Sequence, residues 1–292
     1  MNTSNATLQL PGTSVTKKSV LSRCLRQPGV MIGGTIILLF VLVAVAAPLI
    51  APYKPNTSDW MAIRQGPTVA HWFGTDDLGR DILTRIIYGT QASLLVGIVS
   101  VAIAIAIGVP LGMVAGYFGG IVDMVISRIT DALLACPFLV LAIAFAAFLG
   151  ASLENAMIAI GISAMPIFVR LTRGQVMTVK AEDYVDAARL LGVPHRKIML
   201  TYILPNAMAP IIVQATIIMA TAVLAEASLA FLGLGQRPPS PSWGTMLDVA
   251  RQFLTESPWM AIWPGIAIIL LVMGFNLLGD GLNDALDPRR DD

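Results

Sequence analysis

Charged residues divide the chain into six long runs that are uncharged and mostly apolar. The runs cover 27–53, 86–122, 132–153, 155–169, 198–225 and 257–279. A helix needs about 20 apolar residues to cross the hydrocarbon core of a membrane, and only the fourth run is clearly short. Each run can close its backbone hydrogen bonds internally as a helix, as lipid requires. The pattern predicts an all-α polytopic membrane protein with six transmembrane helices.

Composition agrees with a membrane protein. The 292 residues are 56% hydrophobic and 13% charged, whereas soluble domains carry roughly 25% charged residues. Disorder needs low hydrophobicity and high net charge, and neither holds here. A net charge of +1 disfavours nucleic-acid binding. The two cysteines, Cys24 and Cys136, lie in different surroundings, so no disulfide framework is indicated.

The distribution of Lys and Arg predicts the orientation, because these residues concentrate in cytoplasmic segments. With the N-terminus inside, the inner segments hold thirteen of the 19 Lys and Arg residues and the outer segments hold six. Both termini are therefore expected in the cytoplasm. The expected organisation is a cytoplasmic tail at 1–27, a first transmembrane helix at 28–51, a periplasmic loop at 52–88, a five-helix core at 89–283 with a cytoplasmic loop at 174–206, and a cytoplasmic tail at 284–292.

The outer loop carries signals of its own at 74–89. Thr75 or Asp76 can cap a helix, and Asp81 precedes Arg85 by four residues in the favourable order. One helical face then carries Ile82, Leu83, Ile86 and Ile87. We expect a short amphipathic helix on the outer surface that leads into the second span. It would serve as an interfacial anchor or as a gating or docking element.

The inner loop between the fourth and fifth runs predicts a second short helix, at 183–192. Acidic residues at its start suit the helix dipole, and Tyr184, Ala188 and Leu191 form a stripe. Gly192 fits the left-handed residue past a helix end, and Pro194 stops continuation. A plain connector does not need this helix. It either docks a cytoplasmic partner or rests on lipid headgroups.

A few charged or aromatic side chains lie inside or beside the predicted spans. Arg128 and Asp131 are three residues apart and are expected to pair. Glu226 falls near the outer end of the fifth run, where it would contact the amino group of a peptide, reach the headgroups, or bond amides of the proline-rich loop after it. Trp243, at the end of that loop, fits an aromatic-belt residue.

Motifs for catalysis are missing from the sequence. It has no Gly-x-x-x-x-Gly-Lys-Ser/Thr phosphate loop, and no Lys follows a Gly. The two histidines, His71 and His195, are predicted on opposite sides of the membrane, and no metal motif is present. We expect no catalytic and no metal site, so that any ATP is bound by a partner.

Four stretches, taken together and in order, are similar to blocks of one family. They are 73–81; Asp186-Ala187-Ala188 with Gly192 and 203–206; 231–235 with 238–244; and 276–289. On these stretches the chain resembles the C-type inner-membrane permease subunits of bacterial ATP-binding-cassette (ABC) importers for dipeptides, oligopeptides and nickel. The likeness runs from about residue 28 to 290. Asp186 stands where the so-called EAA loop usually has Glu, and Gln91 and Asn283 stand where Arg is common.

This resemblance implies a type I importer permease in the bacterial inner membrane, working by alternating access. The implied partners are a homologous B-type permease, two ATPases that bind ATP and Mg, a periplasmic substrate-binding protein, and lipid. The residues implied in ATPase coupling are Asp186, Ala187, Ala188, Arg189 and Gly192. The residues expected in structural or gating roles are Asp76, Gly79, Arg80, Asp81, Arg85, Arg128 and Asp131. Glu226 is the candidate in the substrate path.

Dipeptides or short oligopeptides are the expected substrates, and nickel or a glutathione-like compound is the alternative. A rival of another class is a stand-alone secondary transporter, which would need broken helices or paired titratable groups at mid-membrane. A third is a passive membrane anchor. Neighbouring reading frames for an ATPase and a secreted binding protein would separate these readings.

Overall fold

The computed structural model describes residues 27–286. The expected N-terminal tail and most of the C-terminal tail lie outside this range. Within it the chain is helical apart from loops, turns and one isolated bridge between Thr75 and Asp81. The helices are α2 (Pro28–Ile50), α3 (Ile82–Phe118), α4 (Gly120–Leu134), α5 (Phe138–Leu149), α6 (Leu153–Lys180), α7 (Asp183–Leu190), α8 (His195–Lys197), α9 (Leu204–Phe231), α10 (Trp243–Ala250) and α11 (Trp259–Leu286).

Five helical stretches are long and apolar enough to cross a membrane. They are α2, α3, α6, the continuous stretch His195–Phe231 that ends in α9, and α11. The third predicted run differs from expectation, because α4 and α5 are bent by 91° at their break. Pro137 lies at that break, and a residue that precedes proline is disfavoured in the helical region. The chain thus has the helices of a multi-pass membrane protein, with five candidate spans, or six where the bent pair counts as one.

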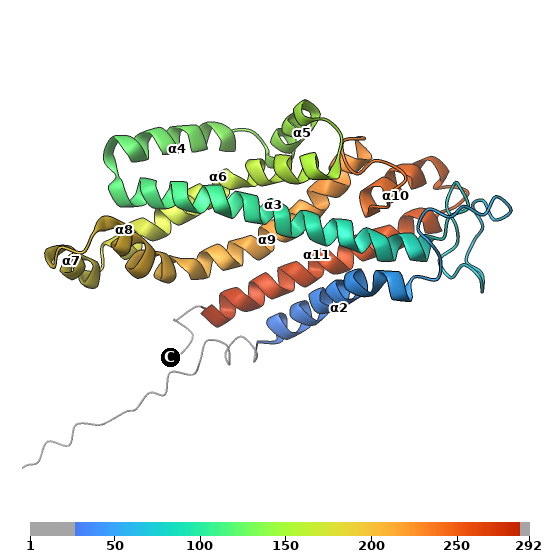
Figure 1. Cartoon of the computed structure of the whole chain (residues 1–292), viewed down its shortest axis with the longest axis horizontal. Coiled ribbons are helices and arrows are strands. Elements are labelled where there is room, and N and C mark those ends of the chain that lie inside the picture. The colour runs from blue at the N-terminus through green and yellow to red at the C-terminus, as the bar shows by residue number, and fades with distance from the viewer. Residues whose placement is uncertain (1–26, 287–292) are drawn as a thin grey trace, which may run out of the picture.

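The long helices lie side by side along the long axis of the molecule (Figure 1). We call the end that carries residues 51–81 the loop end, and the opposite end, which carries α7, the α7 end. α3 packs along α6, α2 packs along α11, and α9 contacts both α3 and α11. The apolar side chains of α2 are largely exposed, as expected for a helix at the edge of a bundle that faces lipid.

Two helix pairs approach closely because glycines line their contacts. A Cβ atom at Gly112 of α3 would lie 2.5 Å from the carbonyl oxygen of Val169 on α6. A Cβ atom at Gly33 of α2 would lie 2.6 Å from the carbonyl oxygen of Gly274 on α11. Small residues allow such backbone contact in membranes. Each pair is therefore expected to move as a unit.

Trp243 was expected in an aromatic belt, and this prediction is wrong. Its side chain is fully buried at the start of α10. The indole Nε1 donates a hydrogen bond to the carbonyl oxygen of Ile86 at 3.1 Å, and the ring meets Phe40 edge-on. Gly89 makes room for it, since a Cβ there would lie 2.8 Å from Trp243 Cδ1. The proline-rich loop therefore folds back onto α3.

Candidate functional site

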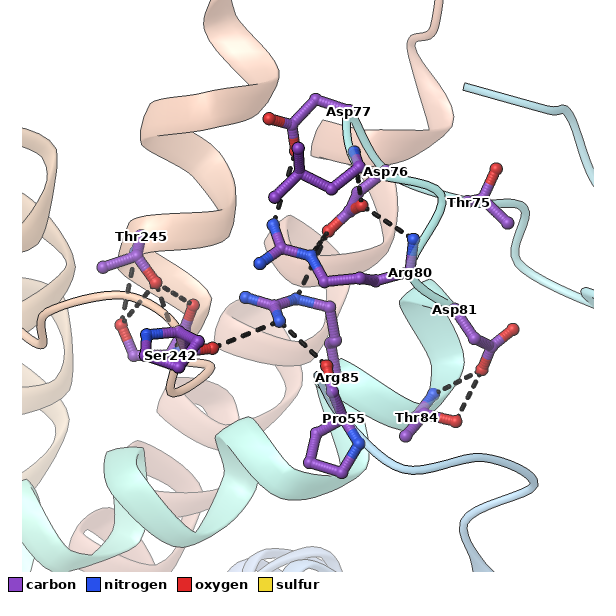
Figure 2. A network of polar contacts seen from close by, with 12 residues as sticks. Pro55, Thr75, Asp76, Asp77, Arg80, Asp81, Thr84, Arg85, Ser242 and Thr245 are labelled. Atoms are coloured by element: carbon purple, nitrogen blue, oxygen red, sulfur yellow. Dashed lines mark hydrogen bonds and ion pairs between the residues drawn. The ribbon is translucent and has the colours of Figure 1, made fainter. Parts of the chain in front are cut away.

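A polar network around Asp76 organises the loop end (Figure 2). Asp76 is buried, and its Oδ2 accepts a hydrogen bond from Arg80 Nε at 2.7 Å. Its Oδ1 accepts from the backbone amides of Leu78 and Arg80, at 3.0 and 2.9 Å. Both carboxylate oxygens are thus satisfied, as a buried charge requires. The ion pair fixes the turn before α3.

Arg85 joins this turn to two other segments. Its Nε lies 3.5 Å from Asp76 Oδ2. Its Nη1 donates to the carbonyl oxygens of Pro55 at 3.0 Å and Pro239 at 3.4 Å. The side chain is buried, and Figure 2 shows its guanidinium between Asp76 and Pro55. Arg85 therefore ties the start of α3 to the 51–81 loop and to the proline-rich loop.

The start of α3 corrects the expected amphipathic helix. Asp81, not Thr75 or Asp76, is the N-cap, and its Oδ2 accepts from the Thr84 amide at 2.8 Å. Arg85 turns to Asp76 instead of pairing with Asp81. Residues 82–88 form the first turns of the long helix α3, and Ile82 is buried. The helix start is thus packed inside the protein, where Asp81 caps it and Arg85 lies beside Asp76.

Two further features define the loop end. Gly79 has a φ of +71°, and a Cβ there would overlap the carbonyl oxygen of Asp59. Only glycine fits this position without strain.

Burial raises the pKa of Asp77, and the negative charge of Asp76 raises it further, while Arg80 opposes the shift. The charged form of Asp77 is therefore disfavoured in the folded loop.

At the α7 end, the predicted short helix is confirmed. α7 runs from Asp183 to Leu190, Gly192 follows with a φ of +74°, and Pro194 precedes α8. Arg189 Nη1 donates to Asp186 Oδ1 at 2.8 Å, and this pair is partly exposed.

The buried face of α7 differs from the expected stripe. Val185 and Ala188 are buried, whereas Tyr184 is exposed. Leu190 and Leu191 are 89% and 83% exposed. α7 therefore presents two large apolar side chains at its C-terminal end, away from its packed face.

The expected pair of Arg128 with Asp131 is not the one that forms. Asp131 Oδ1 lies 2.6 Å from Nη2 of Arg170 on α6. Asp123 on α4 is held by Arg173, which also comes from α6. Sequence proximity suggested a partner within α4, but α6 lies alongside α4 and presents both arginines.

Glu226 lies inside the protein near the loop end of α9. Its side chain is 1% exposed, which rules out an extension to the headgroups. The side chain of Ser242 is a polar neighbour of its carboxyl group, and within the described part of the chain the Oε1 of Glu226 has no hydrogen-bond partner. It thus meets a side chain of the proline-rich loop rather than the loop's amides.

Sequence reasoning missed the contacts between distant segments. Tyr117 and Arg173 were not singled out, and His195 was considered only as a metal ligand, although each makes a side-chain contact to another helix. Tyr117 lies beside the Gly-rich end of the second run, which was the only available signal. Across residues 27–286, no three His, Cys, Asp or Glu side chains gather closely enough to hold a metal ion.

Comparison with known proteins gives consistent matches. Residues 108–292 match the family model of the binding-protein-dependent transport system inner membrane component. Residues 18–67 match the N-terminal transmembrane domain of oligopeptide transport permease C.

Three curated relatives illustrate the likeness. The chain is 49% identical to the dipeptide transport system permease protein DppC of Alkalihalophilus pseudofirmus, over 89% of this chain and 85% of the relative. It is 44% identical to DppC of Haemophilus influenzae, over 89% and 90%. It is 43% identical to the glutathione transport system permease protein GsiD of Pectobacterium atrosepticum, over 91% and 89%.

A solved structure shares the fold. The inward-facing MetNI methionine ABC transporter contains a chain that aligns with a TM-score of 0.58 at 19% identity, over 70% of this chain and 98% of that one.

Proposed function

Because this chain belongs to the family of binding-protein-dependent transport system inner membrane components, we propose that it is the C-type permease subunit of an ATP-driven importer of dipeptides or short oligopeptides. The observation that carries the proposal is the 49% identity to a dipeptide permease across 89% of the chain. The match of residues 18–67 to the N-terminal domain of oligopeptide permease C supports the C-type assignment. Family membership argues against a stand-alone transporter or a passive anchor.

Glutathione is the second candidate substrate. A permease named for glutathione is 43% identical to this chain, close to the identity of the dipeptide permeases. Glutathione and dipeptides share an amide backbone with charged ends, so one path can suit both. Uptake of a radiolabelled dipeptide into proteoliposomes, with unlabelled dipeptide or glutathione as competitor, separates them. Stronger competition by glutathione would overturn the first choice.

The proposed setting is the bacterial inner membrane, with both termini and α7 in the cytoplasm and the loop end in the periplasm. The positive charge near α7 supports this orientation. Basic residues at that end of the described chain are Arg170, Arg173, Lys180, Arg189, Arg196 and Lys197. A periplasmic substrate-binding protein would then deliver substrate to the loop end, where the network of Asp76, Gly79, Arg80, Asp81 and Arg85 holds the loop in shape.

The chain itself is proposed to be non-catalytic. Two ATPases would bind ATP and Mg²⁺, and a homologous B-type permease would complete the membrane path. The C-terminal end of α7 suits a docking surface for an ATPase, because Leu190 and Leu191 are exposed there. Asp186, Ala187 and Arg189 would belong to the same surface. ATP binding can drive alternating access only by favouring one conformation over the other. A movement of α7 would carry that preference into the membrane helices.

Glu226 is proposed to contact substrate only in another conformation. Its carboxyl group is closed off from solvent in this structure. It lies against Ser242 at the N-terminus of α10, so α10 would have to move to expose it. Glu226→Gln keeps the shape and cannot ionise. A rise in the KM for dipeptide uptake, with unchanged thermal stability, is expected. An unchanged KM would remove Glu226 from the substrate path.

The decisive experiment is co-purification. The tagged chain is extracted from its native host in mild detergent, and its companions are quantified by mass spectrometry. We expect one homologous permease and two ATPase equivalents per chain. Recovery of the chain alone, as a stable oligomer without an ATPase, would overturn the proposal.

Two variants test the coupling segment in the co-purified complex, where ATP hydrolysis and dipeptide uptake are measured together. Ala188→Arg places a charge in the packed face of α7, and Gly192→Pro cannot adopt the positive φ seen there. Both are expected to insert into the membrane while ATP hydrolysis is uncoupled from uptake. Ala181→Arg, at an exposed position before α7, is the control and should transport normally. Normal transport by the first two would overturn the assignment.

A further inference from the structure

α7 is a peripheral helix that lies beyond the ends of α3 and α6 (Figure 1). Its packed residues, Val185 and Ala188, share a hydrophobic cluster with Tyr117 near the end of α3. That cluster also contains Val176 and Val179 of α6. It includes two isoleucines between α8 and α9 as well, so a displacement of α7 acts on α3, α6 and α9 through one contact region.

The phenol of Tyr117 is the polar centre of this region. The side chain is 4% exposed, and its hydroxyl lies 2.7 Å from Nδ1 of His195 at the start of α8. The two rings also meet edge-on, with centroids 5.6 Å apart. His195 lies five residues beyond the last residue of α7. One hydrogen bond thus joins the end of α3 to the chain that leaves α7.

Two cations lie over the same ring. Lys180 Nζ is 5.6 Å from the ring centroid of Tyr117, and the guanidinium carbon of Arg189 is 5.7 Å from it. Both distances fall within the range of cation–π attraction. Lys180 also donates to the carbonyl oxygen of Tyr117 at 2.5 Å. Positive charges suit the C-terminal end of α3, where carbonyl groups are left unpaired.

Asp186, one of the two acidic residues of α7, is connected to this ring through Arg189. Arg189 donates to Asp186 Oδ1 at 2.8 Å, so Asp186 sets the direction of the guanidinium that lies over Tyr117. Four elements therefore meet at one side chain: α3 supplies Tyr117, α6 ends with Lys180, α7 supplies Arg189 and α8 begins with His195.

We propose that Tyr117 is the positioning residue that fixes the α7 segment to α3, through its hydrogen bond to His195 and the stacking of Lys180 and Arg189 on its ring. Only one part of this inference rests on the proposed function: an ATPase displaces α7, and the displacement is passed to α3. α3 packs on α6 through Gly112, and its first turns hold the Arg85 network. One continuous helix, α3, therefore spans the distance from Tyr117 to the loop end, with Pro110 as its one internal proline.

The first test measures position without ATPase or substrate. Cys24 and Cys136 are replaced by Ser, and nitroxide labels are placed at Leu95→Cys on α3 and Leu190→Cys on α7, which are both exposed. Residues 95 and 118 alone are about 35 Å apart along the helix, a distance suited to pulsed electron paramagnetic resonance. The readout is the distance distribution between the two labels in the purified full chain. Displaced and docked positions of α7 give different distances, so the distribution broadens as the ratio of displaced to docked α7 rises.

A matched set of variants isolates the hydrogen bond. Tyr117→Phe removes only the hydroxyl, and His195→Leu removes its partner. Each should raise the ratio of displaced to docked α7 about fivefold, as expected for one lost hydrogen bond. His195→Asn keeps an amide near the position of Nδ1 and should restore the narrow distribution. Tyr53→Phe loses a comparable hydrogen bond, to the carbonyl oxygen of Ala70, and should leave the distribution unchanged.

The second test measures the consequence in the co-purified complex in proteoliposomes. Tyr117→Phe and His195→Leu should each lower the number of radiolabelled dipeptides imported per ATP hydrolysed. The double variant should be no worse than either single variant, because both remove the same contact. His195→Asn should restore the ratio.

The outcomes separate the inference from the proposed function. Unchanged distance distributions in Tyr117→Phe and His195→Leu would overturn the positioning role, whatever the chain transports. Broadened distributions with an unchanged transport-to-hydrolysis ratio would overturn the coupling consequence. A wild-type chain that binds no ATPase would overturn the proposed function, while the distance measurements would still decide the position of α7.

Discussion

Arg173 on α6 binds both carboxylate oxygens of Asp123 on α4, with Nη2 2.6 Å from Oδ2 and Nε donating to Oδ1. The pair is partly buried, and Ser127 donates a further hydrogen bond to Oδ1 of Asp123. The neighbouring pair of Arg170 and Asp131 has a single contact and side chains that are more than half exposed. α4 is thus fixed to α6 mainly at its first turn.

This difference predicts unequal effects of two similar substitutions. Asp123→Asn should lower the free energy of unfolding by about 1.5–3 kcal/mol, since it removes a two-point charged contact. Asp131→Asn should cost less than about 1 kcal/mol, as exposed ion pairs contribute little. Thermal unfolding of the purified chain in detergent measures both. Equal shifts in the two variants would mean that Asp123 contributes no more than a surface charge.

The close contact of α3 with α6 predicts an effect of adding one methyl group. Gly112→Ala places Cβ 2.5 Å from the carbonyl oxygen of Val169 and 2.8 Å from Thr172 Cβ. Overpacking of this kind costs about 1–3 kcal/mol, so the thermal midpoint should fall. Gly174→Ala on α6 is the control, because its Cβ meets nothing within 4 Å. It should gain up to about 1 kcal/mol from helix propensity. A neutral Gly112→Ala would show that the helices are not in direct contact.

The exposed leucines beside α7 predict a defect in assembly without a defect in folding. Leu190→Ser should reduce the amount of ATPase that co-purifies with the chain, because the apolar surface buried in the contact is lost. Stability should stay within about 0.5 kcal/mol, since the side chain is 89% exposed. Leu200→Ser, at a position 54% exposed just before α9, is the matched control. Equal ATPase recovery from both variants would contradict the proposed docking surface.

The raised pKa of Asp77 predicts a pH-dependent difference at the loop end. The folded protein holds the proton of Asp77 more tightly than the unfolded chain does, whose pKa is near 3.8. The stability contributed by this group is therefore present below that value and is lost as pH rises above it. Asp77→Asn cannot ionise, so it should be more stable than the wild type at pH 7, by no more than about 1 kcal/mol for a partly exposed group.

Unfolding midpoints of both proteins between pH 3 and pH 7 test this prediction. The difference between them should shrink toward zero at the acid end. Asn56→Ala in the same loop, which removes no ionisable group, is the control and should show no such trend. A wild type more stable than Asp77→Asn at pH 7 would contradict the expected sign.

Local signals in the sequence predicted the parts of the fold that local chemistry decides. The α7 helix followed from acidic residues at its start, from Gly192 and from Pro194, all within twelve residues. The uncharged runs located the long helices, but they did not predict the bend between α4 and α5 in the third run. The family resemblance, rather than composition, carried the functional assignment.

The contacts of the candidate sites could not be predicted because their partners are distant in sequence. Arg85 was assigned to Asp81, four residues away, but its acceptors include Pro239, which is 154 residues away. Asp131 was assigned to Arg128 on its own helix, but its partner Arg170 comes from α6. Helical spacing gives the residues that share a face. It does not give which other helix that face meets.

Trp243 provides the clearest test of a tertiary contact that the sequence did not indicate. Trp243→Phe removes the hydrogen bond to Ile86 and leaves space in a fully buried site. Together these should cost about 1–3 kcal/mol. Trp72→Phe is the matched control, because this side chain is 68% exposed and its replacement should change stability by less than about 0.5 kcal/mol. Thermal midpoints in detergent compare the stability of the two variants. The difference in fluorescence emission between the wild type and each variant gives the emission of the replaced indole and so reports its surroundings. If Trp243 were instead a membrane-belt residue, the two variants would lose similar stability. A water-soluble quencher would then also reduce the part of the wild-type fluorescence that is missing in Trp243→Phe.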